Sequence, residues 1–144
     1  MARIEFHFNA PALVGYTCRL LRKVHTRGLR AQVVGHASTL TQLDQALWTF
    51  APLEFLPHCN LQAPAPMLQA SAVLLAETPT ADWHRQVLIN LGEVVPEGFE
   101  GFERIIDVVT LDDLHRAQGR ERWREYARLG HELVRHDLQQ PSAS

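Results

Sequence analysis

The sequence predicts an α/β fold: a single domain of three layers, in which a mainly parallel five-stranded sheet lies between helices on both faces. The chain opens with the order strand, helix, strand, helix, and short apolar segments continue to alternate with helical ones in its second half. Such alternation is typical of a parallel sheet covered on both sides. At 144 residues the chain can form one hydrophobic core but not two. We therefore expect one domain over residues 1–138 and a disordered tail over residues 139–144.

The N-terminal part of the chain supplies two strands and the first helix. Residues Arg3 to Phe8 alternate between apolar and polar, which predicts a strand. Pro11 is favoured in a first helical turn, and Gly28 tolerates the left-handed conformation that ends a helix, so we expect a helix between them. Ala31 to Gly35 is a second short apolar strand.

The remaining elements follow from the same signals. A second helix is predicted to begin at a capping box formed by Thr39 and Gln42. Its inward-facing residues are expected to be Leu43, Ala46, Leu47 and Phe50. The proline-rich segment from Pro57 to Gln69 is predicted to be a loop. Further strands are expected at Ser71–Glu77, Val87–Leu91 and Arg104–Val109. A last helix, capped by Thr110, is expected to extend to about Asp137.

The composition excludes several classes of protein. The formal net charge of −2 disfavours a general nucleic-acid binder, which usually carries an overall positive charge. The apolar runs are too short to span a membrane, and the N-terminus lacks the pattern of a secretory signal. Cys18 and Cys59 lie far apart and form no CxxC pair, which indicates neither a disulfide framework nor a zinc site. We expect a cytoplasmic protein with reduced thiols.

No motif in the sequence indicates an enzyme. The first strand is followed by NAPALVG and not by a Gly-rich fingerprint, and GxxxxGK[ST] does not occur, so the fold is expected to be Rossmann-like without a P-loop. His58 and Cys59 are adjacent, and adjacent side chains rarely face each other, which favours a structural role. Asp112 and Asp113 are better explained as charges at a helix start than as a catalytic pair. The histidines show no HExxH or comparable spacing. We expect no cofactor and no metal.

The helix expected after Thr110 has two unlike sides. Leucines and a tyrosine gather on one side, which predicts packing onto the core. These residues are Leu111, Leu114, Tyr126, Leu129 and Leu133. Arg116, Arg120, Trp123 and Arg124 gather on the opposite side. Guanidinium groups bind carboxylates, and an indole offers apolar area with a hydrogen-bond donor at its edge. This side is therefore suited to a ligand that is both acidic and aromatic.

An alternative interpretation of this helix remains open. Trp123 could be a partly buried core residue, and the arginines could pair with Glu121, Glu125 and Asp113 on neighbouring turns. Gly119 could also split the helix, because glycine weakens a helix interior by about 1 kcal/mol.

A second group of aromatic residues lies at the end of the second helix. Trp48 falls off the core-facing side of that helix, and Phe55 follows in the next loop. An aromatic pair near the surface is a common anchor for a protein partner. The alternative is that both side chains are tucked under the proline-rich loop.

Two segments of the chain resemble the chi subunits of bacterial DNA polymerase III. Leu43 to His58 carries an LD-x-x-LW helix followed by F-L-PH, and Glu103 to Gly130 carries a strand of the E-[VI]-[VI]-D type followed by an RERW-R-x-Y helix. Each motif alone is weak, but their order and spacing fit the family over nearly the whole chain. The matching residues are Leu43, Asp44, Leu47, Trp48, Phe55, Leu56, Pro57, His58, Asp107, Arg120, Glu121, Arg122, Trp123, Arg124 and Tyr126.

The resemblance implies a non-catalytic accessory subunit of the clamp loader. It implies two protein partners: the psi subunit, and the acidic, phenylalanine-ended C-terminal tail of single-stranded DNA-binding protein. DNA would be contacted only indirectly. The residues that the resemblance assigns to the tail are Val109, Arg116, Arg120, Trp123 and Arg124. Those that it assigns to psi are Trp48, Phe55 and Pro57.

Two other functions are weighed against this one. The first is a small enzyme that binds a nucleotide or metabolite on the same fold. The second is a protein that binds single-stranded DNA directly through the basic helix, which the net charge of −2 disfavours.

Overall fold

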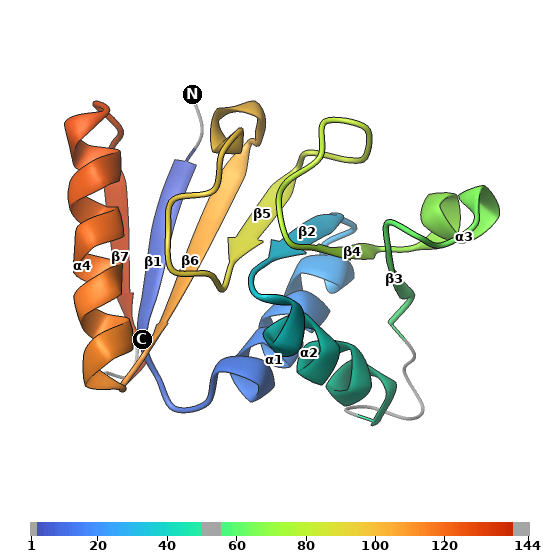
Figure 1. Ribbon diagram of the computed structural model, residues 1–144, viewed down its shortest axis with the longest axis horizontal. Coiled ribbons are helices and arrows are strands. Elements are labelled where there is room, and N and C mark those ends of the chain that lie inside the picture. The colour runs from blue at the N-terminus through green and yellow to red at the C-terminus, as the bar shows by residue number, and fades with distance from the viewer. Residues whose placement is uncertain (1–2, 50–55, 140–144) are drawn as a thin grey trace.

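The computed structural model describes residues 3–49 and 56–139, which form one parallel sheet with helices on both faces (Figure 1). The strands are β1 (Arg3–Ala10), β2 (Ala31–Val34), β3 (His58–Asn60), β4 (Val73–Ala76), β5 (Val87–Asn90), β6 (Arg104–Thr110) and β7 (Leu133–Asp137). The helices are α1 (Leu13–Thr26), α2 (Ala37–Thr49), α3 (Ala65–Ala70) and α4 (Asp113–Arg128), with one 3₁₀ turn, η1 (Phe99–Gly101). The strand order is β3-β4-β2-β5-β6-β1-β7, and all neighbouring strands are parallel. The predicted α/β class is confirmed, with seven strands in place of five.

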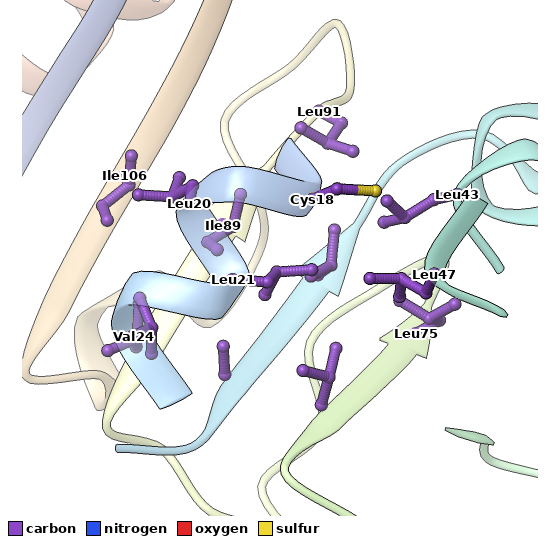
Figure 2. Packing of buried hydrophobic residues seen from close by; sticks show 14 of the residues in the cluster. Cys18, Leu20, Leu21, Val24, Leu43, Leu47, Leu75, Ile89, Leu91 and Ile106 are labelled. Atoms are coloured by element: carbon purple, nitrogen blue, oxygen red, sulfur yellow. The ribbon is translucent and has the colours of Figure 1, made fainter. Parts of the chain in front are cut away.

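One face of the sheet is covered by α1 and α2. Figure 2 shows the leucines of both helices meeting the apolar side chains of the sheet. Leu21 of α1 and Leu43 of α2 are fully buried in this layer, beside Ile89 of β5. The two predicted helices thus bury the stripes that their apolar spacing indicates. Phe50, which was expected to extend the second stripe, lies outside the described residues.

The opposite face is covered by α4 and by the segment around η1. Tyr126 of α4 is buried against two rings, with centroid distances of 5.8 Å to Phe6 of β1 and 5.0 Å to Phe99 of η1. Side chains of one strand alternate between the two layers, so Phe6 faces α4 while its neighbour Glu5 faces the α1 side. This alternation decides which strand residues can reach α4.

The prediction of a loop from Pro57 to Gln69 is wrong in part. His58–Asn60 forms β3, which pairs with β4 at one edge of the sheet, and Ala65–Ala70 forms the short helix α3 after Pro64. A strand of three residues is too short to show an alternating pattern of apolar and polar residues. The prolines indicated a loop, although proline is also common at the start of a helix such as α3.

The prediction that the last helix extends to about Asp137 is also wrong. The helix ends at Arg128, Gly130 has a φ of 89°, and β7 follows. β7 pairs with β1 as the other edge of the sheet. The left-handed conformation of Gly130 allows the chain to turn back onto the sheet.

Two helix starts differ from the prediction by a few residues. α2 begins at Ala37, so Thr39 lies inside its first turn and does not form the expected capping box. α4 is capped by Asp112, whose carboxylate accepts a hydrogen bond from the backbone of His115 at 3.0 Å, and not by Thr110. Residues 140–144 of the expected tail lie outside the described residues. None of the described helices is long and apolar enough to cross a bilayer.

Leu21→Ala should lower the free energy of unfolding by about 2–5 kcal/mol, because it leaves a cavity beneath α1. Leu114→Ala is the matched control: its side chain is 66% exposed, so the same truncation should change stability by less than about 0.5 kcal/mol. Urea denaturation of both variants provides the measurement. Equal losses would show that the faces of α1 and α4 are assigned wrongly.

Candidate functional site

Helix α4 is fixed to the sheet by a buried ion pair. Arg122 of α4 and Asp107 of β6 are 2% and 0% exposed. The guanidinium donates from Nη2 to Asp107 Oδ1 at 2.8 Å and from Nε to Oδ2 at 2.9 Å. Its third nitrogen, Nη1, donates to the backbone oxygen of Glu93 at 3.0 Å, and Asn90 of β5 donates to Asp107 Oδ2 at 3.1 Å. All three guanidinium nitrogens therefore have acceptors, as a buried arginine requires.

Burial and the charge of Arg122 shift the pKa values of the titratable groups near this pair. Burial raises the pKa of Asp107, while the charge of Arg122 and the hydrogen bonds from Arg122 and Asn90 act to lower it. Burial and the positive charge of Arg122 lower the pKa of His115. His115 Nδ1 accepts a hydrogen bond from the backbone N–H of Thr110 at 2.9 Å, which requires this nitrogen to be unprotonated. His115 thus joins the first turn of α4 to the end of β6.

A pocket of about 390 Å³ lies beside α4. The five residues that the sequence analysis assigned to a tail-binding site all line it: Val109, Arg116, Arg120, Trp123 and Arg124. The structure therefore brings the predicted residues together on one surface. Five further residues complete the lining: Phe6, Phe8, Asn9, Gly119 and Arg135.

The floor of the pocket is apolar and closely packed. The Trp123 ring meets the Phe6 ring edge to face, with centroids 5.1 Å apart, and is half-buried. At Gly119 the helix approaches β6 so closely that an added Cβ would lie 2.9 Å from a methyl group of Val109. Gly119 does not split the helix: it is buried within an unbroken α4. Its missing side chain allows Val109 to reach the pocket floor.

The rim of the pocket is positively charged. Arg116, Arg120 and Arg124 of α4 are exposed. Arg135 of β7 lies over the Phe8 ring, with its guanidinium carbon 5.4 Å from the centroid. The alternative that these arginines are paired holds in part, since Arg124 binds Glu121 in an exposed ion pair. No carboxylate of the described residues pairs with Arg116, Arg120 or Arg135.

The predicted leucine stripe of α4 is wrong. Leu111, Leu114 and Leu129 are exposed, and Leu133 belongs to β7. The helix instead buries Gly119, Arg122 and Tyr126. Of the stripe, Tyr126 is buried in the core as expected, and Leu133 packs partly buried against the same core from β7. The stripe failed because the buried side of α4 contains a glycine and a charged residue, which a hydrophobic pattern does not register.

The aromatic group after α2 is only partly described. Trp48 is 53% exposed, and its ring lies 5.1 Å from that of His58 in β3. Pro57 is half-buried beside them, and Phe55 lies outside the described residues. His58 is buried, with Nδ1 2.8 Å from the backbone oxygen of Leu56 and Nε2 3.2 Å from Asp44. Its ring nitrogens are thus directed at groups other than Cys59, which fits the predicted structural role.

Comparison with known proteins assigns the family. The sequence profile described as "DNA polymerase III chi subunit, HolC" matches residues 1–134. The chain belongs to the chi-subunit family of DNA polymerase III. The DNA polymerase III subunit chi of Pseudomonas aeruginosa is 31% identical over 147 residues, covering 96% of this chain and 98% of the relative. The protein of the same name from Haemophilus influenzae is 33% identical over 92 residues, covering 64% of this chain and 63% of the relative.

A chi subunit is an accessory subunit of DNA polymerase III and is not itself catalytic. The family therefore implies a role that involves protein partners within the holoenzyme. A surface pocket is accordingly a better candidate for the functional site than a catalytic centre. Some residues of the chi resemblance have structural roles here. Asp107 and Arg122 form the buried ion pair, and Leu43 and Leu47 belong to the core.

Sequence reasoning missed Phe6, Phe8, Asn9 and Arg135 as pocket residues. They lie on β1 and β7, far from α4 in the sequence. A usable signal existed in β1, because its alternation places Phe6 and Phe8 on one face. Arg135 could not be found while β7 was assigned to the helix.

Removing one partner of the buried pair should be strongly destabilising. Arg122→Met should lower the free energy of unfolding by about 3–5 kcal/mol, because it leaves the carboxylate of Asp107 buried without its partner. Combining it with Asp107→Leu should recover much of the loss, since neither charge then remains. Urea denaturation of the single and double variants tests this. A double variant as unstable as the sum of the single ones would contradict the account.

Proposed function

We propose that this protein is the accessory subunit of the DNA polymerase III clamp loader that joins single-stranded DNA-binding protein to the psi subunit. The pocket beside α4 binds the acidic, phenylalanine-ended C-terminal tail of single-stranded DNA-binding protein. The surface around Trp48, Phe55 and Pro57 binds psi. The observation that carries the first assignment is an apolar pocket ringed by four arginines, three of which have no carboxylate partner among the described residues.

The chemistry of the pocket matches both parts of such a tail. Its floor presents Trp123, Val109 and the two phenylalanines of β1, which offer a surface for an aromatic ring. Its rim presents Arg116, Arg120 and Arg124 on α4 and Arg135 on β7, so that acidic groups could be bound from two sides. At about 390 Å³ the pocket is of a size that binds small ligands and the ends of peptides.

The two kinds of contact contribute differently to binding. Exposed ion pairs add only about 0.2–1 kcal/mol each. A micromolar complex needs about 8 kcal/mol. Most of the affinity must then come from the aromatic ring, which binds in the least exposed part of the pocket. The arginines chiefly provide selectivity, a faster encounter and a dependence on salt.

The positions of the two surfaces suit a bridging protein. Trp48 lies beside β3, which is one edge strand of the sheet, whereas Arg135 lies on β7, the other edge strand. Figure 1 shows α4 and β3 at opposite ends of the molecule. Two partners bound at these surfaces would not compete for space, so both could be held at once.

Arg120→Ala should weaken binding of a short peptide that ends in acidic residues and Pro-Phe by about 2–5-fold, and should reduce the salt dependence of binding. Titration calorimetry at two salt concentrations measures both. Arg128→Ala is the matched control: Arg128 is also an exposed arginine of α4, but it pairs with Glu125 and does not line the pocket. Equal affinities for wild type and Arg120→Ala would contradict the assignment of the pocket. Binding of an oligodeoxynucleotide in place of the peptide would favour a direct DNA binder.

Trp48→Ala should impair binding to psi by at least tenfold and leave peptide binding unchanged, because an exposed aromatic side chain at an interface is a typical energetic hot spot. Co-purification with psi and peptide titration of the same preparation measure the two effects. Thr49→Ala, an exposed neighbour at the end of α2, is the control. Undiminished co-purification of the Trp48 variant would remove this surface from the proposal.

A further inference from the structure

A group of metal-binding side chains lies on the face of β1 and β7 that is turned away from the pocket. Glu5 and His7 of β1 and His136 of β7 each place one ligand atom within 4.8 Å of the others. His7 and His136 are direct neighbours in the pairing of the two strands, and their ring centroids are 4.8 Å apart. Glu5 and His136 are close enough to interact, with His136 Nε2 3.0 Å from Glu5 Oε1.

The buried histidine in this group has an unsatisfied nitrogen. His7 is 7% exposed, and its Nε2 makes no hydrogen bond. This nitrogen lies 3.8 Å from Glu5 Oε1, beyond hydrogen-bond length. The opposite ring nitrogen, Nδ1, lies 2.5 Å from the hydroxyl of Tyr16 in α1. A buried polar atom without a partner is costly, so its orientation toward two other ligand atoms requires an explanation.

We propose that Glu5, His7 and His136 bind a transition-metal ion of the Zn²⁺ class. With bonds of about 2.0–2.1 Å, tetrahedral ligand atoms lie about 3.3 Å apart. The separations of 3.0 Å and 3.8 Å in this group bracket that value. Two imidazoles and one carboxylate favour Zn²⁺ or its neighbours over Mg²⁺ and Ca²⁺, which prefer oxygen ligands.

The surroundings fit the ligand roles. When the Nδ1 proton of His7 is donated to the Tyr16 hydroxyl, the lone pair of Nε2 is left for the ion, which is the usual arrangement of a metal-binding histidine. Arg104 binds Glu5 through Nε to Oε2 and through Nη2 to Oε1 at 3.1 Å, which orients the carboxylate. Arg3 Nε lies 3.7 Å from Oε2. The two arginines also repel a cation, so the site binds less tightly than an all-neutral one would.

The site is accessible from solvent and links two distant parts of the chain. The His136 side chain is 44% exposed, which leaves an entry path and an open position for water. A bound ion would join β1 to β7, the edge strand that carries Arg135 to the pocket on the other face. This inference does not depend on which ligand the pocket binds.

Titration calorimetry with ZnCl₂, on protein first freed of metal by a chelator, tests the proposal. The wild type should bind one equivalent, and His136→Asn should lose it. His25→Asn is the matched control, because His25 is an exposed histidine at the end of α1 that lies outside the group. Tyr16→Phe should weaken binding by about 10–100-fold, because it removes the group that orients His7.

A thermal shift adds a second measurement. Zn²⁺ should raise the Tm of the wild type and of His25→Asn, and should leave that of His136→Asn unchanged. The absence of Zn²⁺ binding by the wild type would overturn the proposal. So would equal binding by His136→Asn and His25→Asn, because the ion would then be bound elsewhere. Circular dichroism of each variant confirms that the fold is retained, and Tyr16→Phe keeps the proposal testable if His136→Asn does not fold.

Discussion

The ion pair between Arg122 and Asp107 determines where α4 lies, and the pocket depends on that position. A buried guanidinium whose three nitrogens all have fixed acceptors permits one rotation and one height of the helix against β6. With Arg122 directed inward, Arg120 and Arg124 are both directed outward on the opposite side of the helix, since two residues correspond to about 200° of helix rotation. The buried charge of Arg122 thus determines the positions of the exposed arginines on the rim.

The close approach at Gly119 adds to this constraint. Because this residue has no side chain, α4 lies near Val109, and Trp123 reaches the Phe6 ring. The pocket floor is therefore made of side chains that are packed against one another before any ligand arrives. A surface held in this way requires little ordering on binding, which preserves affinity that flexible loops would lose. A short peptide could then bind with appreciable affinity through few contacts.

The sequence predicted the class of fold because its central strands are continuously apolar and its first two helices bury conventional stripes. It also predicted the arginine and tryptophan side of α4, because a helix places residues three and four apart on one surface whatever the rest of the fold does. The prediction failed where pairing across long distances decides the structure. β7 has a mixed pattern and gains its strand character by pairing with β1, and β3 is too short to show a pattern. The phenylalanines of the pocket floor were missed for the same reason, since β1 and α4 are far apart in the sequence and line one pocket only in the folded chain.

The pocket is built from elements that lie far apart in the sequence, β1 on one side and α4 and β7 on the other. β1 is made before α4 and β7, and it lies between β6 and β7 in the finished sheet. β1 therefore cannot pair with its two neighbours until β6 and β7 have been made. A chain that stops before β7, or is cleaved after α4, could still pack α1 and α2 on the central strands. It would lack β7 and with it Arg135 of the pocket rim. Such a fragment would have an incomplete pocket, so the site forms only after β7 has been made.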